Sequence, residues 1–356
     1  MAVDLLPRER VEIALSHRVA DRVPVDFWSV PEVVEKLKAH FRVSETEEVL
    51  EALEIDIREV NPDYIGPALR ELPDGSFYGP MGHHMRKVSN AFSVYNEYIS
   101  FPLAYAGSVD DLRGYEYWPN PDHYDYEGLS DKIGRLHEKY CIKLFTGGLF
   151  ELAWELRGLE QFYVDMALDP EMVHYTMDKL TGFFCEYVTR IMQAAGDKYD
   201  IVYTYDDIAS QQAPLVSDDM FKDLIKPYHK RLGGVIKDFG KKVMYHSCGA
   251  VYDLLDELVT LPIDILNPLQ PAAKGMDMVK IKTNYGERLC FHGGIDIQYV
   301  LPYGSKREIE EAVAHAVGTL GLGGGYILTT AHNIQNDTSA ENIVAMYEAA
   351  RNCTQN

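Results

Sequence analysis

A histidine and a cysteine stand two residues apart at the end of an apolar run, in the stretch YHSCG. Side chains at positions i and i+2 of a β-strand point to the same face, so His246 and Cys248 can converge on one ion while Ser247 points away. Imidazole and thiolate are ligands that suit zinc, and a catalytic zinc usually keeps three protein ligands and one open position. The alternative is a buried thiol beside a hydrogen-bonded histidine.

A third ligand has to come from another segment of the chain. We expect His332 to supply it, because a closed barrel brings the ends of other strands across its mouth. Glu151, Cys290 and His292 are the other candidates, although Cys290 lies deeper in its apolar run than His292. The predicted site is therefore a zinc ion bound by His246, Cys248 and His332.

Carboxylates form the second group of residues that could do chemistry. Asp206 and Asp207 end the apolar run at 201–207, where they could act as a general base, bind a substrate hydroxyl or cation, or cap the next loop. Glu151 follows the glycines of TGGLFELAWEL and is either a ligand or a helix N-terminal carboxylate stabilised by the helix dipole. We treat all three as candidate catalytic residues.

The elements that must position these residues are short apolar runs separated by helical patterns. Eight such runs occur, at residues 23–28, 55–62, 142–148, 201–207, 242–248, 264–270, 289–296 and 325–333. This alternation predicts an α/β fold, a (β/α)8 TIM barrel. A doubly wound open sheet is the alternative, but no GxGxxG motif follows any of the runs. In a barrel the carboxyl ends of the strands form the active-site rim, which gathers the candidate residues at one end.

Residues 65–125 interrupt this rhythm, because they are rich in tyrosine and show little helical periodicity. We expect an insertion with short antiparallel strands after the second barrel strand. It forms either a lid over the barrel mouth or an aromatic satellite core. His83 and His84 within it are interpreted as a solvated loop pair. The whole chain, residues 1–356, is interpreted as a single domain.

Composition limits the class of function. The net charge is −21, and a surface this acidic disfavours binding to nucleic acid or to anionic membranes. No stretch approaches the roughly 18 apolar residues of a membrane span, and the N-terminus has no apolar core typical of a signal peptide. The five cysteines are odd in number and widely spaced, which argues against a disulfide framework. These features indicate a reduced cytoplasmic enzyme that acts on small molecules.

Four segments together resemble the uroporphyrinogen decarboxylase superfamily: GGLFELAWELRGLEQFYVDM, YHSCGAV, HGGIDIQ and TTAHNIQNDTSAENIVAMYEAAR. The resemblance covers most of the chain and implies a (β/α)8 barrel. True decarboxylases of the superfamily bind a tetrapyrrole with an N-terminal RQAGR motif. The matching segment here is DRVPVDFWS, which has Arg22 but neither the paired arginine nor the glycine. This departure, together with the acidic composition, argues against decarboxylation.

The other main branch of the superfamily consists of zinc-containing, corrinoid-linked methyltransferases, which carry a His-x-Cys pair at the fifth strand. Many add a cysteine near the eighth strand, where this chain has His332. Decarboxylases of the superfamily have a substrate-binding histidine there, so the resemblance implies that His332 is either a metal ligand or a substrate contact. Within that branch the chain looks most like the methyltransferase I components of anaerobic O-demethylases.

The resemblance implies a Zn²⁺-dependent transfer of a methyl group from a small methylated substrate, with a phenyl methyl ether as the best match. The acceptor of the methyl group is a cobalamin cofactor, in its cob(I)alamin state, carried by a corrinoid partner protein. A uroporphyrinogen-type decarboxylase, a methylcobalamin:thiol methyltransferase and a non-catalytic corrinoid- or tetrapyrrole-binding protein are the alternatives.

Residues that would bind such a substrate also lie near the predicted strand ends. Phe27, Trp28 and Phe150 are expected to pack against an aromatic ring, together with tyrosines of the insertion. Asn267 and His292, at the ends of the sixth and seventh runs, are expected to contact the substrate as well.

Overall fold

Seven parallel strands form one curled sheet in the computed structural model, which describes residues 5–90 and 93–353. Residues 91–92 of the predicted insertion therefore lie outside the described part of the chain. The strands of this sheet, in spatial order, are β1 (Ile57–Glu59), β5 (Cys141–Phe145), β6 (Ile201–Tyr205), β7 (Lys242–His246), β8 (Ile265–Leu269), β9 (Cys290–Ile295) and β10 (Tyr326–Thr330). Each strand pairs with the next in parallel, so all carboxyl ends lie at one rim.

The inside of the curled sheet is filled by a small apolar cluster with members from all seven strands. Ile57 of β1 and Ile327 of β10, from the two edge strands, belong to this same cluster. Val11 and Leu15 of helix α1 (Pro7–Leu15) join it as well. This mostly parallel sheet with surrounding helices is consistent with a TIM-like fold.

The first predicted strand, residues 23–28, is not a regular strand. Val25 makes one parallel bridge to Leu328 of β10, and its carbonyl accepts a hydrogen bond from the backbone N–H of Asp56, just before β1. The segment therefore lies between the two edge strands. Pro24 has no N–H to donate, which limits how far a ladder can extend there.

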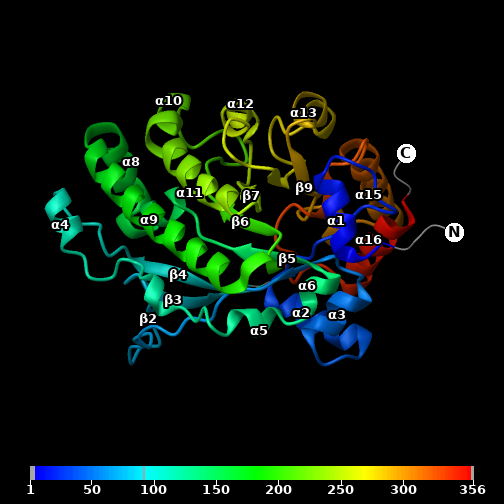
Figure 1. Ribbon diagram of the computed structural model, residues 1–356, viewed down its shortest axis with the longest axis horizontal. Helices are drawn as coiled ribbons and strands as arrows, with labels where there is room; N and C mark the ends of the chain where they lie inside the picture. The colour runs from blue at the N-terminus through cyan, green and yellow to red at the C-terminus, as the bar shows by residue number, and fades with distance from the viewer. Residues whose placement is uncertain (1–4, 91–92, 354–356) are drawn as a thin grey trace.

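Helices cover the outside of the sheet (Figure 1). The α-helices that follow α1 are α2 (Pro31–Phe41), α3 (Thr46–Ala52), α4 (Val109–Arg113), α5 (Leu129–Ile133), α6 (Leu136–Lys139), α7 (Phe150–Arg157), α8 (Leu159–Leu168), α9 (Pro170–Ala195), α10 (Asp218–Met220), α11 (Lys226–Asp238), α12 (Leu255–Leu258), α13 (Met278–Tyr285), α14 (Val300–Tyr303), α15 (Lys306–Leu320) and α16 (Ala340–Asn352).

Helix α15 illustrates why these segments form helices. A capping box at Ser305 and Glu308 begins it, and Ile309, Val313 and Val317 bury one face at helical spacing.

A second, three-stranded antiparallel sheet lies between β1 and β5 in the chain. It consists of β2 (Phe77–Tyr78), β3 (His84–Ser89) and β4 (Val94–Ser100), and it lies in the half of the molecule away from the chain termini (Figure 1). The interpretation of His83 as a solvated residue is wrong, because it is buried and its ring contacts that of Tyr98. Within the described residues, no helix has both the length and the apolarity needed to cross a bilayer.

Candidate metal centre and cavity

The period of the strand places His246 inside the curled sheet. Met244, two residues earlier in β7, belongs to the interior apolar cluster, so His246 faces the interior one layer nearer the rim. Cys248 follows directly after the strand. Gly249 then has a φ of +89°, and a Cβ there would come within 2.4 Å of the Ser210 carbonyl oxygen. The chain can therefore turn sharply after Cys248 because glycine occupies the next position.

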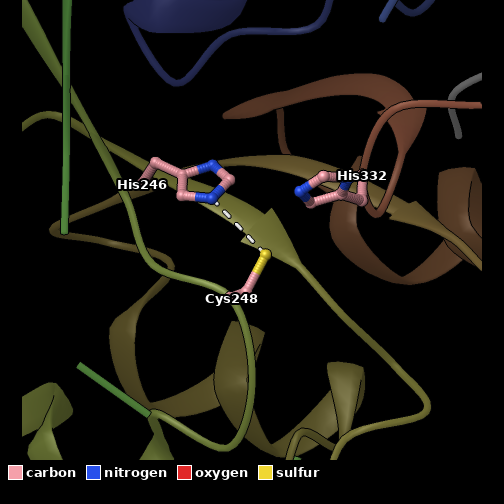
Figure 2. Close-up of side chains that lie close together, drawn as sticks. All are labelled: His246, Cys248 and His332. Carbon is pink, nitrogen blue, oxygen red and sulfur yellow. Dashed lines mark hydrogen bonds between the residues drawn. The ribbon is translucent and has the colours of Figure 1, made fainter. Parts of the chain in front are cut away.

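His246, Cys248 and His332 form a group whose ligand atoms all lie within 4.8 Å of one another. The Cys248 Sγ lies 3.4 Å from the His246 Nε2, and the His332 ring is turned toward both (Figure 2). A tetrahedral zinc with bonds of about 2.0–2.3 Å sets its ligand atoms roughly 3.3–3.6 Å apart. The histidine–cysteine pair already has this spacing, and His332 needs a shift of about 1 Å. The donor set thus fits a zinc ion.

The surroundings of Cys248 favour a cation at this point. Burial, together with the nearby Asp207 and Glu151 carboxylates, raises the pKa of the Cys248 thiol well above its ordinary value. Burial also lowers the pKa of His332, which keeps that imidazole neutral and able to donate a lone pair. A bound dication would offset the cost of forming a buried thiolate beside carboxylates, because the charges would then attract.

Asp207 follows the neighbouring strand β6 and contacts two of the candidate metal ligands. Its Oδ1 accepts a 2.8 Å hydrogen bond from the Cys248 backbone N–H and lies 3.5 Å from the His246 Nε2. Burial acts to raise the pKa of Asp207, but the nearby His246 and the hydrogen bond from the Cys248 backbone N–H outweigh it, so the pKa is lowered. Asp207 is therefore a carboxylate that fixes the loop holding Cys248.

Glu151 also lines the cavity, on the first turn of α7. Burial and the neighbouring carboxylates of Asp207, Asp206 and Glu155 raise the pKa of Glu151 to about 8. A carboxyl group with such a pKa holds a proton at neutral pH and can donate it.

Asp206 has a different position. It is fully buried, and its two carboxylate oxygens accept hydrogen bonds from the backbone N–H groups of Phe150 and Glu151, which cap the N-terminus of α7. One oxygen also contacts the Nε2 of His229 in α11. The structure thus places Asp206 behind the rim, where it caps helix α7 and not the loop that follows its own strand.

A cavity of about 750 Å³ opens beside the candidate metal centre, lined by Asp207, His246 and His332 on one side. Aromatic side chains form much of the remaining wall, namely Phe27, Trp28, Phe145, Tyr203 and Tyr205. The Trp28 ring lies parallel to the His246 ring at 6.0 Å, and the Phe145 ring stacks on those of Tyr203 and Tyr205 at 5.2 and 5.5 Å. These flat faces suit a small planar ligand.

Three residues predicted to bind substrate lie elsewhere. Phe150 is fully buried in the core against Phe162, because the helix α7 begins there and turns its ring inward. Asn267 and His292 are also fully buried, directly behind His246, and they do not line the cavity. The structure therefore places Phe150 in the core and the other two in a polar layer beneath the candidate metal centre.

Sequence reasoning assigned no role to Asp26 or Lys143, although both line the cavity and form a buried pair with the Lys143 Nζ 2.8 Å from the Asp26 Oδ2. A lysine in the middle of the apolar strand CIKLF was a signal for such a role, because a lysine is rarely buried without a partner. The alternation of Tyr203 and Tyr205 in IVYTY was a second signal, since both face the cavity.

The fold and the site define an α/β protein of TIM-like architecture with a candidate metal centre at the carboxyl rim of its sheet. A family model described as "Uroporphyrinogen decarboxylase (URO-D)" matches residues 112–353. The chain belongs to this family.

The relatives show which proteins the chain is similar to. It is 23% identical over 190 residues to the uroporphyrinogen decarboxylase of Chlorobium phaeovibrioides, and 24% identical over 190 residues to that of Chlorobium luteolum. Each match covers 51% of this chain, which spans about half the length of these curated relatives. A solved methyltransferase from Methanosarcina mazei aligns over 98% of both chains with a TM-score of 0.70 at 17% identity, which shows the shared fold.

Proposed function

We propose that the protein is a zinc-dependent methyltransferase of this family that moves a methyl group from a small methylated substrate to the cob(I)alamin of a corrinoid protein. The observation that carries the proposal is the cluster of His246, Cys248 and His332 at the edge of an aromatic cavity. Similarity of fold to the Methanosarcina mazei methyltransferase over nearly the whole chain supports it.

The charges in the cavity favour this reaction over decarboxylation of a tetrapyrrole. A tetrapyrrole with several carboxylates needs cations that are free to bind them. The two buried cations that line this cavity are paired, Arg58 with Glu47 at 2.7 Å and Lys143 with Asp26 at 2.8 Å. A neutral substrate such as a phenyl methyl ether suits this acidic, aromatic wall better.

The residues of the chain would have the following roles in this reaction. Trp28, Phe145 and Tyr203 pack against the aromatic ring of the ether and exclude water. When bound by the His246–Cys248–His332 cluster, a zinc ion supplies a Lewis acid that stabilises negative charge on the leaving oxygen. Glu151 holds a proton close to this point, and the corrinoid supplies the nucleophile.

Methyl transfer can be measured directly with reduced free cobalamin as the acceptor and a methoxylated phenol as the donor. We expect the absorbance of cob(I)alamin to be replaced by that of methylcobalamin. Cys248→Ala should abolish this change, whereas Cys290→Ala should retain it, because Cys290 lies in the interior apolar cluster beside His17. Turnover of a porphyrinogen without any methyl transfer would contradict the proposal and favour a decarboxylase.

A further inference from the structure

A continuous row of buried polar side chains connects the Nδ1 of His246 with the Asp26–Lys143 ion pair in the cavity wall. The His246 Nδ1 lies 2.5 Å from the Asn267 Oδ1, and the Asn267 Nδ2 lies 2.5 Å from the His292 Nδ1. The His292 Nε2 lies 3.1 Å from the Asp26 Oδ2, which also accepts a 2.8 Å hydrogen bond from Lys143. These contacts connect a candidate metal ligand to a buried ion pair through two fully buried residues.

The strand period explains why these side chains meet. Cys141, Met244, Ile265 and Cys290 belong to the apolar cluster inside the curled sheet. The residues two positions later on the same four strands are Lys143, His246, Asn267 and His292, so they form the next layer toward the rim. Four members of the row therefore form one layer of the sheet interior, and they come from β5, β7, β8 and β9.

The direction of each hydrogen bond in the row follows from the carboxylate of Asp26 at its end. A carboxylate only accepts hydrogen bonds, so Asp26 requires the His292 Nε2 to carry a proton. Lys143 already balances the charge of Asp26, and a second buried cation beside it would be costly, so His292 is neutral. The Nδ1 of neutral His292 must then accept, and the Asn267 amide must donate to it.

The direction continues to the metal cluster. Because its amide nitrogen is directed at His292, Asn267 presents its oxygen to His246, whose Nδ1 must therefore carry the proton. The His246 Nε2 is then left with a free lone pair, 3.4 Å from the Cys248 Sγ, and its 3.5 Å approach to the Asp207 Oδ1 is a contact without a shared proton. The reverse direction would protonate the Nε2 and prevent His246 from binding a metal.

We propose that Asp26, His292 and Asn267 are positioning residues that fix the tautomer of His246 in its metal-binding form. Their effect on a metal passes entirely through His246. The inference rests on the proposed metal site, but the tautomer itself is a property of the chain and can be observed without any metal. We call this row of hydrogen bonds from Asp26 to His246 the relay. It predicts a different zinc affinity for each substitution of Asn267.

Zinc affinity of Asn267 variants tests the proposal. Asn267→Leu keeps the approximate size but removes both hydrogen bonds, and we expect zinc affinity to fall about 10–100-fold in competition with a chromophoric chelator. Asn267→Asp keeps an acceptor for the His246 Nδ1–H, and we expect it to bind zinc within a few fold of the wild type. Equal affinity in Asn267→Leu and wild type would overturn the proposal, as would an Asp variant as weak as the Leu variant.

The tautomer can be measured on the unaltered protein. In metal-free chain labelled with ¹⁵N-histidine, long-range ¹H–¹⁵N spectra should show His246 protonated at Nδ1 and His292 at Nε2, with assignments from His246→Asn and His292→Asn. Protonation of His246 at Nε2 would overturn the proposal, even if the Leu variant did not fold. A wild-type chain that binds no zinc but shows the expected tautomers would refute the proposed function and leave the relay supported.

Discussion

Two adjacent aspartates show how one strand serves two different purposes. Asp207 lies on the cavity side and holds the backbone of Cys248, while Asp206 is fully buried, caps helix α7 and contacts His229. Both aspartates lie beside a histidine, His246 for Asp207 and His229 for Asp206. Consecutive residues at a strand end point to opposite sides, so one pair belongs to the site and the other to the scaffold.

The comparison shows that residue type alone does not identify a catalytic carboxylate. The surroundings decide: Asp206 accepts hydrogen bonds from backbone N–H groups of one helix and contacts a side chain of another, so removing its charge should affect folding. Asp207 has a side chain that is 40% exposed and lines the cavity, so removing its charge should affect the site. Substitutions at these two positions therefore separate the two roles.

Asp206→Asn should have the largest effect on stability. An amide cannot accept from two N–H donors and His229 at once, so a buried donor loses its partner and the free energy of unfolding falls by about 3 kcal/mol. Urea unfolding measures this change. Zinc bound per folded chain should stay at the wild-type level, and a large loss of zinc with unchanged stability would reverse the assignment of the two aspartates.

Glu151 should give the metal-free protein a pH-dependent stability of about 2 kcal/mol after allowing for partial solvent screening. Its pKa is about 8 in the folded chain against an ordinary value of 4.5, so the folded state holds a proton that the unfolded state releases. Stability should therefore fall as pH rises from 5 to 8.

The matched control for this pH effect is Glu151→Gln, which cannot titrate. Urea unfolding of both proteins at pH 5 and pH 8 isolates the contribution of this carboxyl group. An identical pH response in the two proteins would show that burial and the neighbouring carboxylates do not raise the pKa of Glu151.

Asp207→Asn should have the smallest effect on stability, within about 1 kcal/mol, because its side chain is partly exposed and an amide oxygen can still accept from the Cys248 N–H. Zinc affinity should nevertheless fall about 10-fold, since a carboxylate beside the cluster is lost. Isothermal titration calorimetry with zinc measures this affinity. A drop in unfolding free energy as large as that of Asp206→Asn would remove the distinction between the two positions.

Much of the fold, and the proximity of His246 to Cys248, follows from periodicity. Seven of the eight predicted strands are present, and the period of two correctly brought His246 and Cys248 to one face. The segment at 23–28 makes one isolated bridge, because Pro24 lacks a donor, and a hydrophobic pattern does not show this. The antiparallel sheet β2–β4 occupies part of the predicted insertion, and its role as a lid stays a prediction.

The substrate contacts were less predictable, since they depend on burial behind a strand end as well as on position along the chain. Asn267 and His292 lie at strand ends as expected, but they stack beneath His246 and do not reach the cavity. Phe150 is the first residue of helix α7, and the helical direction of its side chain places its ring in the core. Such packing depends on neighbouring elements that a local pattern does not contain.

The central claim is that His246, Cys248 and His332 hold a metal ion, and elemental analysis of purified protein tests it most directly. The account predicts about one zinc per chain in the wild type and in Cys290→Ala, whose cysteine lies in the interior apolar cluster. It predicts that Cys248→Ala and His332→Ala lose the zinc while remaining folded. A wild-type protein without zinc, or a Cys248→Ala protein that retains it, would contradict the account.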